Sequence, residues 1–244
     1  MKVLLFGAEA DSLRPEIESR GVFELVEHAP DVVVCFGGDG TLLSAELRWP
    51  GVPKVPIRNS RRGNRCIPHP PADVVNHLAE GRLARTEYVK LACDVRRAAG
   101  GAPPDNVSAM NEINVHNGRI HSAVRFSLSL NEEAYEDGAE IIGDGFVIST
   151  PFGSTAYFKQ ITHGIFYSGL GVAFKNASER ISHIVVPDET CVRVRITRGP
   201  AILAFDNAPN HFDLEQGDEV VVRKHDHPAV LLTWRPMTHP SDEF

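Results

Sequence analysis

The chain has 244 residues, of which 42% are hydrophobic and 23% charged, and these proportions exclude collagen-like and disordered chains. Its net charge of −7 argues against general binding to nucleic acid or to anionic membranes. No apolar run approaches the roughly 18 residues of a membrane span. Glu9 and Asp11 interrupt the apolar N-terminal stretch, which argues against a signal peptide. The length suits one large or two small domains that need no disulfide.

The first 85 residues predict an α/β domain. A strand at 31–36 is apolar on both faces, which is typical of a buried parallel sheet. The other predicted elements, in chain order, are a strand at 2–7, a short helix capped by Asp11 or Ser12, a strand at 22–26, a helix from Thr41, a strand at 54–57 and a helix at 72–80.

Between about 86 and 228 the pattern changes to strands. Apolar and polar residues alternate along 124–130, as in a strand with one buried face. Further short strands are predicted at 88–95, 110–116, 145–149, 191–196, 201–205, 219–223 and 229–234. Strands at this spacing indicate a β-sandwich domain over 86–228. The segment from about 229 to 244 could pack back on the first domain.

The cysteines and histidines show no metal-site pattern. No C-x-x-C pair occurs, which favours reduced thiols and a cytoplasmic protein over a zinc site or a disulfide framework; the four cysteines are Cys35, Cys66, Cys93 and Cys191. The run His225-Asp226-His227 offers metal-ligand types, but a polar turn between two strands explains it better.

Residues 47–72 are unusually basic. They contain six basic residues and no acidic one, in a chain whose net charge is −7; the six are Arg48, Lys54, Arg58, Arg61, Arg62 and Arg65. A concentrated cationic loop suits a small polyanion such as a phosphate ester. The alternative is a solvated loop whose arginines pair with acids elsewhere in the chain.

The turn Gly37-Gly38-Asp39-Gly40 joins a buried strand to a predicted helix. Glycines there let backbone amides approach a phosphate, and a helix N-terminus adds partial positive charge. A carboxylate within about 4 Å of a phosphate would cost on the order of 4 kcal/mol at an effective dielectric of about 20. Asp39 therefore fits this position if a metal ion bridges the two groups or if Asp39 takes a proton from an attacking hydroxyl. The alternative is a tight turn with Asp39 exposed or capping the helix.

Polar groups also stand out in the second half. Asn111 and Glu112 begin a predicted strand and suit an adenine or ribose edge, or else form a polar pair that faces water. Ser154 and Thr155 follow a glycine, in a context where a helix begins; they either present amides to an anion or cap the helix without a ligand. Tyr157 is either a stacking surface for a base or a packing residue.

Three of these segments resemble one family. Gly37-Gly38-Asp39-Gly40-Thr41 resembles the signature loop shared by NAD kinases, diacylglycerol-type lipid kinases and phosphofructokinases. Asn111-Glu112-Ile113 resembles the Asn-Glu motif of NAD kinases, and residues 144–157 resemble their long glycine- and threonine-rich motif. That long motif has no counterpart in the other two groups. The order and spacing of all three match, so the resemblance covers about residues 31–235.

The resemblance implies an architecture and an activity. NAD kinases have a small N-terminal Rossmann-like α/β domain and a C-terminal β-sandwich domain, with the active site in the cleft between them. They move the γ-phosphoryl group of ATP, or in some members of inorganic polyphosphate, to the 2′-hydroxyl of the adenosine ribose of NAD. A divalent cation such as Mg²⁺ takes part, and the enzymes are generally homodimers or homotetramers.

The resemblance also implies residue roles by matching position. Asp39 would be the general base. ATP or phosphate would be bound by Gly37, Gly38, Gly40, Thr41, Arg61 and Arg62. NAD would be bound by Asp39, Gly40, Asn111, Glu112, Arg119, Asp144, Thr155, Ala156 and Tyr157. The resemblance assigns no residue to a metal.

Two segments depart from the family pattern. Tyr157 is followed by Phe-Lys-Gln-Ile-Thr-His-Gly, where the family usually has a serine and soon Gly-Gly-Pro, and residues 58–65 replace a neutral loop. Two alternatives therefore stay open. One is a kinase of the same fold that phosphorylates a different hydroxyl, on a phosphorylated sugar or another nucleotide. The other is a catalytically silent regulator that binds NAD(P).

Overall fold

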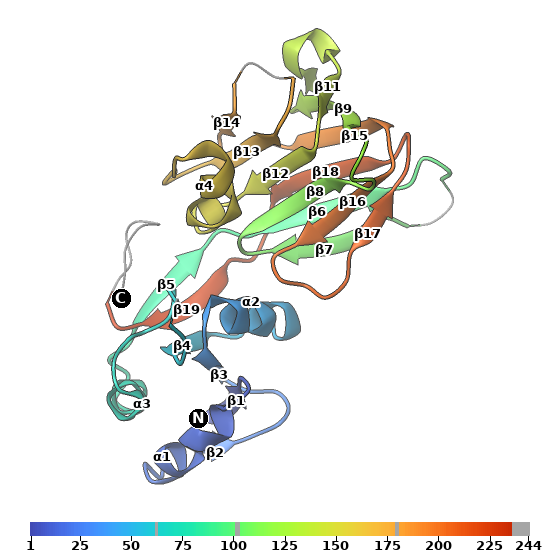
Figure 1. Ribbon diagram of the computed structural model, residues 1–244. Helices are drawn as coiled ribbons and strands as arrows, with labels where there is room; N and C mark the ends of the chain where they lie inside the picture. The colour runs from blue at the N-terminus through green and yellow to red at the C-terminus, as the bar shows by residue number, and fades with distance from the viewer. Residues whose placement is uncertain (62, 101–102, 179–180, 236–244) are drawn as a thin grey trace. The chain divides into compact units, whose positions relative to one another are not determined.

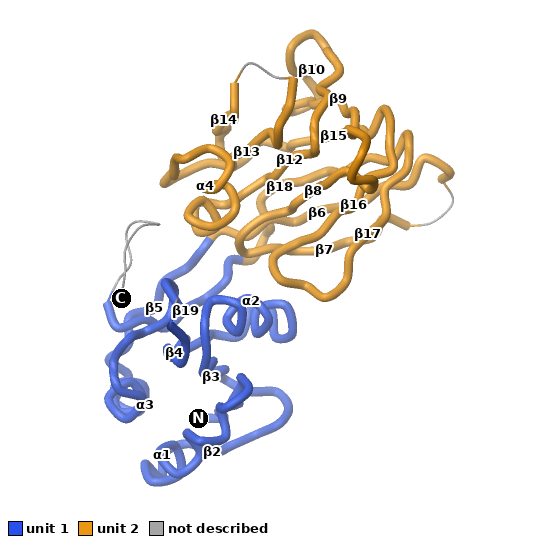
Figure 2. Tube along the Cα trace, viewed as in Figure 1, with its two compact units in different colours: residues 1–88, 228–244 blue, residues 89–227 orange. Residues whose placement is uncertain are grey.

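The computed structural model describes residues 1–61, 63–100, 103–178 and 181–235, and it divides into two compact units. Unit 1 consists of residues 1–88 and the segment that begins at Pro228, and unit 2 consists of residues 89–227 (Figure 2).

Unit 1 is built on a six-stranded sheet with the order β2-β1-β3-β4-β19-β5 (Figure 1). All neighbours in this sheet are parallel except β19 and β5, which are antiparallel. The strands are β1 (Lys2–Phe6), β2 (Glu24–Leu25), β3 (Val32–Gly37), β4 (Lys54–Arg58), β5 (Ala84–Tyr88) and β19 (Ala229–Thr233). As the apolar run predicts, the first four residues of β3 are buried on both faces.

The helices of unit 1 follow its parallel strands. They are the 3₁₀ turn η1 (Ala10–Leu13), α1 (Arg14–Glu18), α2 (Asp39–Arg48) and α3 (Pro71–Ala79). Helix α3 buries Val74, Val75 and Leu78 in the apolar core. Helix α2 begins at Asp39, two residues before the predicted start, because Gly38 already has the extended conformation of an N-cap (φ −115°, ψ −170°). The predicted strand at 22–26 is reduced to the two residues of β2.

The C-terminal strand completes the sheet of unit 1. Strand β19 pairs with both β4 and β5, so the last strand that the structure describes is an interior strand of the first unit. Trp234 follows it and packs its ring against His69 and His77, with ring centroids 4.0 and 3.9 Å apart.

Unit 2 is a β-sandwich of two antiparallel sheets. A seven-stranded sheet has the order β10-β9-β15-β18-β6-β7, with β11 paired to β9, and a six-stranded sheet has the order β14-β13-β12-β8-β16-β17. The ring of Phe126 on β9 lies 4.9 Å from that of Phe146 on β12, so side chains of the two sheets meet. The strands and helices of unit 2 are β6 (Leu91–Arg96), β7 (Asp105–Ala109), β8 (Glu112–Asn117), β9 (Val124–Leu130), β10 (Glu133–Ala134), η2 (Tyr135–Gly138), β11 (Ile141–Gly143), β12 (Gly145–Ser149), η3 (Gly153–Thr155), α4 (Tyr157–Thr162), β13 (Leu170–Lys175), β14 (His183–Val186), β15 (Val192–Arg198), β16 (Ala201–Phe205), β17 (Phe212–Leu214) and β18 (Glu219–Lys224).

The architecture thus has the predicted class, an α/β unit followed by a β-sandwich. Several strands of unit 2 were not predicted, among them β13, whose uninterrupted apolar residues show no alternation because all six of its residues are buried. In the ranges that the structure describes, every helix is too short or too polar to cross a membrane.

Candidate active site

The glycine turn of unit 1 is shaped by close packing. A Cβ atom on Gly37 would lie 2.2 Å from Oγ1 of Thr41, and one on Gly38 would lie 2.8 Å from Oγ of Ser60. Side chains at these two positions would push apart the start of α2 and the loop that follows β4. The glycines are therefore required for the turn itself, and they also leave its backbone uncovered.

This turn lies where the strand order of the sheet reverses. The chain passes from β1 to β2 on one side of β1, and then to β3 on the other side. In open parallel sheets, ligands bind outside the carboxyl ends of the strands at such a switch point. The end of β3 and the first turn of α2 occupy that position in unit 1.

Asp39 is the first residue of α2, and its carboxylate is held from the opposite loop. Oδ2 accepts the backbone N–H of Asn64 at 3.1 Å, and Oδ1 accepts that of Arg65 at 2.8 Å. The thiol of Cys66 lies 3.7 Å from Oδ1, and burial together with the charge of Asp39 raises the pKa of Cys66, which keeps this thiol protonated. These contacts orient the carboxylate, and its remaining lone pairs can still accept a proton.

The structure spreads the basic residues of the 47–72 segment apart. Lys54 is fully buried and pairs with Glu46. The guanidinium of Arg48 lies 5.1 Å from the centre of the Phe6 ring. Lys54 lies in β4 and not in the loop, so it is not available to a phosphate; its pairing does not decide between the two interpretations, which concern the arginines of the loop.

The loop after β4 lies against the glycine turn, because the N–H of Asn59 donates to the carbonyl of Gly37 at 2.7 Å. Arg61 in this loop is exposed, whereas Arg65 is buried. Arg62, the other expected phosphate ligand, lies outside the described residues.

In unit 2, the two sequence motifs come together. A Cβ atom on Gly153 would lie 2.2 Å from the carbonyl oxygen of Asn111, so the turn after β12 packs directly on the backbone of the Asn-Glu pair. The N–H of Thr150 donates to that same carbonyl at 2.9 Å, and Oγ1 of Thr150 donates to the carbonyl of Met110 at 2.6 Å. One motif therefore fixes the position of the other.

Asp206 fixes the Asn-Glu pair from a third segment, about 95 residues away in sequence. Its carboxylate accepts the backbone N–H groups of Met110, Asn111 and Glu112 at 2.7, 2.7 and 3.2 Å. Burial raises the pKa of Asp206 to about 6, although these three hydrogen bonds act in the opposite direction. Asp206 was not among the predicted site residues; the available signal was an Asp-Asn turn directly after the apolar strand at 201–205.

Glu112 carries a buried carboxyl group. The residue is 8% exposed, and its Oε2 atom has no hydrogen-bond partner among the described residues. Burial and the nearby charge of Asp206 raise the pKa of Glu112 to about 8. At neutral pH this carboxyl group is therefore largely protonated and can donate a hydrogen bond to a ligand.

Strand β8 carries a polar stripe on one face. Glu112, Asn114 and His116 alternate with Ile113 and Val115, both of which are fully buried. Because side chains alternate between the faces of a strand, the three polar residues share one face of the six-stranded sheet. This strand was predicted from the sequence, but its polar face was not.

A second group of polar side chains lies at the far end of β8. The amine of Lys175 donates to Oδ1 of Asn114 at 2.6 Å and lies 5.7 Å from the centre of the Tyr157 ring. The ring of His116 is 6.1 Å from that of Tyr157. The negative charge of Asp144 acts on both Lys175 and His116. We call these five residues the Lys175 cluster, and the set of Asn111, Glu112, Thr150, Gly153 and Asp206 the Glu112 cluster.

The two clusters lie at opposite ends of one strand pair. Glu112 is opposite Ser149 and His116 is opposite Gly145 in the antiparallel pairing of β8 with β12. Four residues at about 3.3 Å each separate these pairs by about 13 Å. Unit 2 therefore presents two groups of hydrogen-bonding side chains that suit the two ends of an extended ligand.

The remaining predicted residues lie at different places in unit 2. Thr155 ends the 3₁₀ turn η3, and Ala156 follows it as the residue before α4. Arg119 is exposed and lies just past the end of β8, so the structure does not bring it to Asn111, which stands before the other end.

The helix expected from Ser154 begins later, at Tyr157, and no side chain caps it. The hydroxyl of Ser154 instead donates to the carbonyls of Pro151 and Phe166, at 2.8 and 3.2 Å. This hydroxyl stabilises the turn internally, because the residue is fully buried.

No group of three or more His, Cys, Asp or Glu side chains within the described ranges is placed to hold a metal ion. The run at 225–227 forms a turn in which the N–H of His227 donates to Nδ1 of His225 at 3.0 Å. All four cysteines are free.

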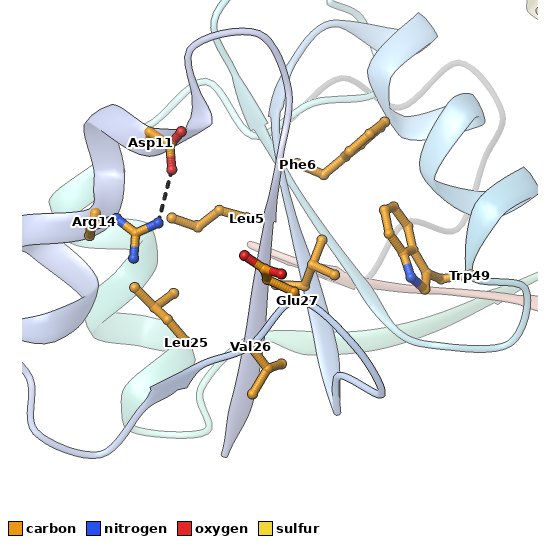
Figure 3. A pocket seen from close by; sticks show the side chains of 9 residues that line it. Leu5, Phe6, Asp11, Arg14, Leu25, Val26, Glu27 and Trp49 are labelled. Carbon is orange, nitrogen blue, oxygen red and sulfur yellow. Dashed lines mark hydrogen bonds and ion pairs between the residues drawn. The ribbon is translucent and has the colours of Figure 1, made fainter.

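Unit 1 also contains a pocket of about 470 Å³ beside β1 (Figure 3). Its walls include apolar side chains and an ion pair between Arg14 and Asp11 at 3.1 Å. None of the predicted site residues that the structure describes lines this pocket.

Comparisons with known proteins agree with these features. The family model of the ATP-NAD kinase C-terminal domain matches residues 110–233. An NAD kinase of Nitrosospira multiformis is 28% identical, in an alignment that covers 99% of this chain and 81% of that protein. An NAD kinase of Thiobacillus denitrificans is 27% identical over 89% of this chain and 76% of its own length.

Two solved structures share the fold. The chain matches a yeast NADH kinase complexed with NADH at a TM-score of 0.77 and 19% identity, over 86% of this chain and 65% of that one. It matches an NAD kinase from Archaeoglobus fulgidus in complex with ATP at a TM-score of 0.75 and 19% identity, over 96% and 94% of the two chains.

Proposed function

The chain belongs to the NAD kinase family, and on that premise we propose that it transfers the γ-phosphoryl group of ATP to the 2′-hydroxyl of the adenosine ribose of NAD, which gives NADP. The observation that carries the proposal is the position of Asp39. Its oriented carboxylate stands at the first residue of a helix, on a glycine turn at the switch point of a parallel sheet. A carboxylate is unfavourable at a phosphate site unless it takes a proton from the attacking hydroxyl or a metal ion bridges it to the phosphate.

In the proposed step, Asp39 takes the proton of the 2′-hydroxyl as its oxygen forms a bond to the γ-phosphorus. The bond between this phosphorus and the β–γ bridging oxygen breaks, and ADP leaves. The backbone around Gly37, Gly38 and Gly40, with Thr41 and Arg61, would bind the phosphates, since α2 directs its N-terminal dipole at this position.

The residues of unit 2 would bind NAD. The two ends of a dinucleotide match the two clusters, which lie about 13 Å apart along β8 and β12. Asn111 and Glu112 would bind one end and Asp144 and Tyr157 the other, with Thr155 and Ala156 in the turn between β12 and α4. Arg119 is assigned to NAD by matching position alone.

Mg²⁺ fits this chain as an ion that arrives on the nucleotide. Mg²⁺ usually keeps several waters and binds through one or two carboxylates together with substrate phosphates, rather than in an all-protein cage. Asp39 is the carboxylate available at the glycine turn. When bound, the ion would neutralise charge on the phosphates.

The family resemblance further supports a cytoplasmic homodimer or homotetramer. The four free cysteines are consistent with a reducing compartment. Purification followed by light scattering would determine the number of subunits.

The decisive experiment incubates the protein with ATP, Mg²⁺ and NAD and measures NADP with an NADP-specific dehydrogenase. Asp39→Asn should lower kcat by roughly 10²–10⁴-fold, because it removes a positioned general base and keeps the shape of the side chain. Asp11→Asn is the matched control, since Asp11 is an exposed carboxylate of unit 1 that pairs with Arg14.

Activity of Asp39→Asn within a few-fold of wild type would refute the role of Asp39. Turnover of a different hydroxyl acceptor, or binding without turnover, would instead support one of the two alternatives.

A further inference from the structure

Lys175 lies in unit 2 outside all the sequence motifs, and its side chain is buried. The residue is 6% exposed and ends β13. Its amine donates to the neutral amide of Asn114, and no ion pair with a carboxylate joins it among the described residues. A buried ammonium group without a direct ion pair is costly, and burial lowers the pKa of Lys175 to about 7, although the charge of Asp144 acts in the opposite direction. The burial of the Lys175 amine therefore calls for a functional explanation, because it does not stabilise the fold.

The Tyr157 ring lies next to this amine. The 5.7 Å distance from Nζ to the ring centre places the amine over the ring in the geometry of a cation–π contact. Tyr157 is half-buried, so part of its ring remains accessible to a ligand. A ring that already holds a cation against one face attracts an electron-rich, uncharged ring and disfavours a second cation.

We propose that Lys175 makes the Tyr157 ring selective for an uncharged heterocycle over a cationic one, so that the chain prefers the reduced dinucleotide to the oxidised one. This inference rests on the proposed function, since it assumes that the Lys175 cluster binds the nicotinamide end. NADH carries an uncharged dihydronicotinamide, whereas NAD⁺ carries a pyridinium cation. Lys175 would act through Tyr157 as a specificity-determining residue, without contact to the reacting atoms.

Two other titratable groups limit the size of this preference. Asp144, in the turn between β11 and β12, acts on Lys175 with a negative charge that partly offsets the amine. His116 on β8 is the second group, and burial and the charge of Lys175 lower its pKa, so it adds little positive charge near neutral pH. With these groups present and an effective dielectric of about 20, we expect the preference to be about 3- to 10-fold.

The test compares kcat/KM for NADH and NAD⁺ in Lys175→Met. This variant keeps the length of the side chain and removes its charge, so the NADH-to-NAD⁺ ratio should fall by about 3- to 10-fold. Lys175→Arg should retain the ratio of the wild type. Lys224→Met is the matched control, because Lys224 is an exposed lysine of unit 2 that pairs with Asp188 at 3.1 Å. An equal change for both nucleotides would overturn the proposal.

A pH series separates charge from packing. In the wild type the NADH-to-NAD⁺ ratio should fall as pH rises through about 7, because Lys175 then loses its charge, and in Lys175→Met the ratio should not change with pH. Lys175→Gln, which can still donate to Asn114, is a second neutral variant if the methionine variant does not fold.

Binding measurements separate this proposal from the proposed function. Dissociation constants of NADH, from its fluorescence, and of NAD⁺, by competition, need no turnover. If the wild type binds both nucleotides but phosphorylates neither, the proposed function fails while the binding ratio still tests Lys175. Equal affinity of the wild type for NADH and NAD⁺ would overturn the role of Lys175 alone.

Discussion

At the scale of single residues, the carboxyl group of Glu112 has the most unusual environment in unit 2. It is buried beside Asp206, whose own carboxylate already accepts three backbone N–H groups, and Lys90 is the cation whose charge acts on Asp206. The pKa of Glu112 is raised from its ordinary value of 4.5 to about 8, so the folded state holds a proton that the unfolded state releases.

Glu112→Gln should therefore change how stability depends on pH. A raised pKa contributes stability that is fully present below pH 4.5 and is lost as pH rises to about 8. Relative to Glu112→Gln, the wild type should lose about 2–4 kcal/mol of unfolding free energy between pH 5 and pH 8.5, since one pKa unit corresponds to about 1.4 kcal/mol. Urea unfolding at both pH values measures this difference.

Glu133→Gln is the control for that experiment, because Glu133 is an exposed carboxylate of the same unit. Its stability should follow that of the wild type at both pH values. A Glu112→Gln variant that also follows the wild type would show that Glu112 is ionised in the folded protein.

From the sequence, Asn111, Glu112 and Asp39 were predicted as site residues, because each stands in a short motif whose residue types suggest chemistry. It could not identify Asp206 or Lys175. Asp206 reaches the Asn-Glu pair across about 95 residues, and the turn residues at 206–207 predict a turn but not the distant backbone that Asp206 binds. Lys175 stands at the end of an apolar strand, where a lysine is normally an exposed strand end.

At the scale of elements, the turn after β12 determines where β8 begins. Gly153 is packed so closely on Asn111 that a Cβ atom would lie within 2.2–2.6 Å of three backbone atoms. Backbone cannot move aside as a flexible side chain does. The two motifs are thus linked by direct contact, since the turn at Gly153 packs on the backbone of Asn111.

Gly153→Ala should destabilise the protein by about 1–3 kcal/mol, as is usual for overpacking, and should raise KM for NAD by displacing Asn111 and Glu112. Chemical denaturation and steady-state kinetics measure the two effects. Gly164→Ala, also in unit 2, is the control, because the nearest atom to its Cβ would be a side-chain oxygen at a tolerable 3.8 Å. Equal behaviour of the two variants would contradict this account of the turn.

The helices and strands could be predicted where the sequence pattern has a single physical explanation. The buried strand β3 and the glycine turn follow from an apolar run that ends in glycines. The start of α4 was not predictable, because Ser154 has the residue type of an N-cap and yet donates to carbonyls within its own turn. Serine can do either, and tertiary contacts decide which.

At the scale of the whole molecule, the chain leaves unit 1 before its sheet is complete. Strand β19 takes an interior position between β4 and β5, so the sheet of unit 1 is completed by residues that follow the whole of unit 2. The sequence indicated that the C-terminal segment could pack back on the first domain, but it did not indicate that this segment forms an interior strand of the sheet. Parallel pairing between β4 and β19 is non-local, and no short-range pattern encodes it.

Trp234 anchors this returning strand, because its ring packs against His69 and His77 and against the apolar core of unit 1. Trp234→Ala should destabilise unit 1 by about 1–3 kcal/mol, less than the cost for a fully buried aromatic residue, since Trp234 is half-buried. Trp234→Phe should recover much of that loss, because it keeps an aromatic ring.

The other tryptophan of the chain, Trp49, also lies in unit 1, so its fluorescence reports the unfolding of that unit alone in both variants. Limited proteolysis at the same denaturant concentrations, read from the fragments of unit 2, reports the unfolding of that unit. Cleavage within unit 2 should be the same in both variants as in the wild type, because the ring contacts of Trp234 described above are with residues of unit 1. An unfolding midpoint of Trp234→Ala equal to that of the wild type would mean that the backbone pairing of β19 holds the sheet together without its tryptophan.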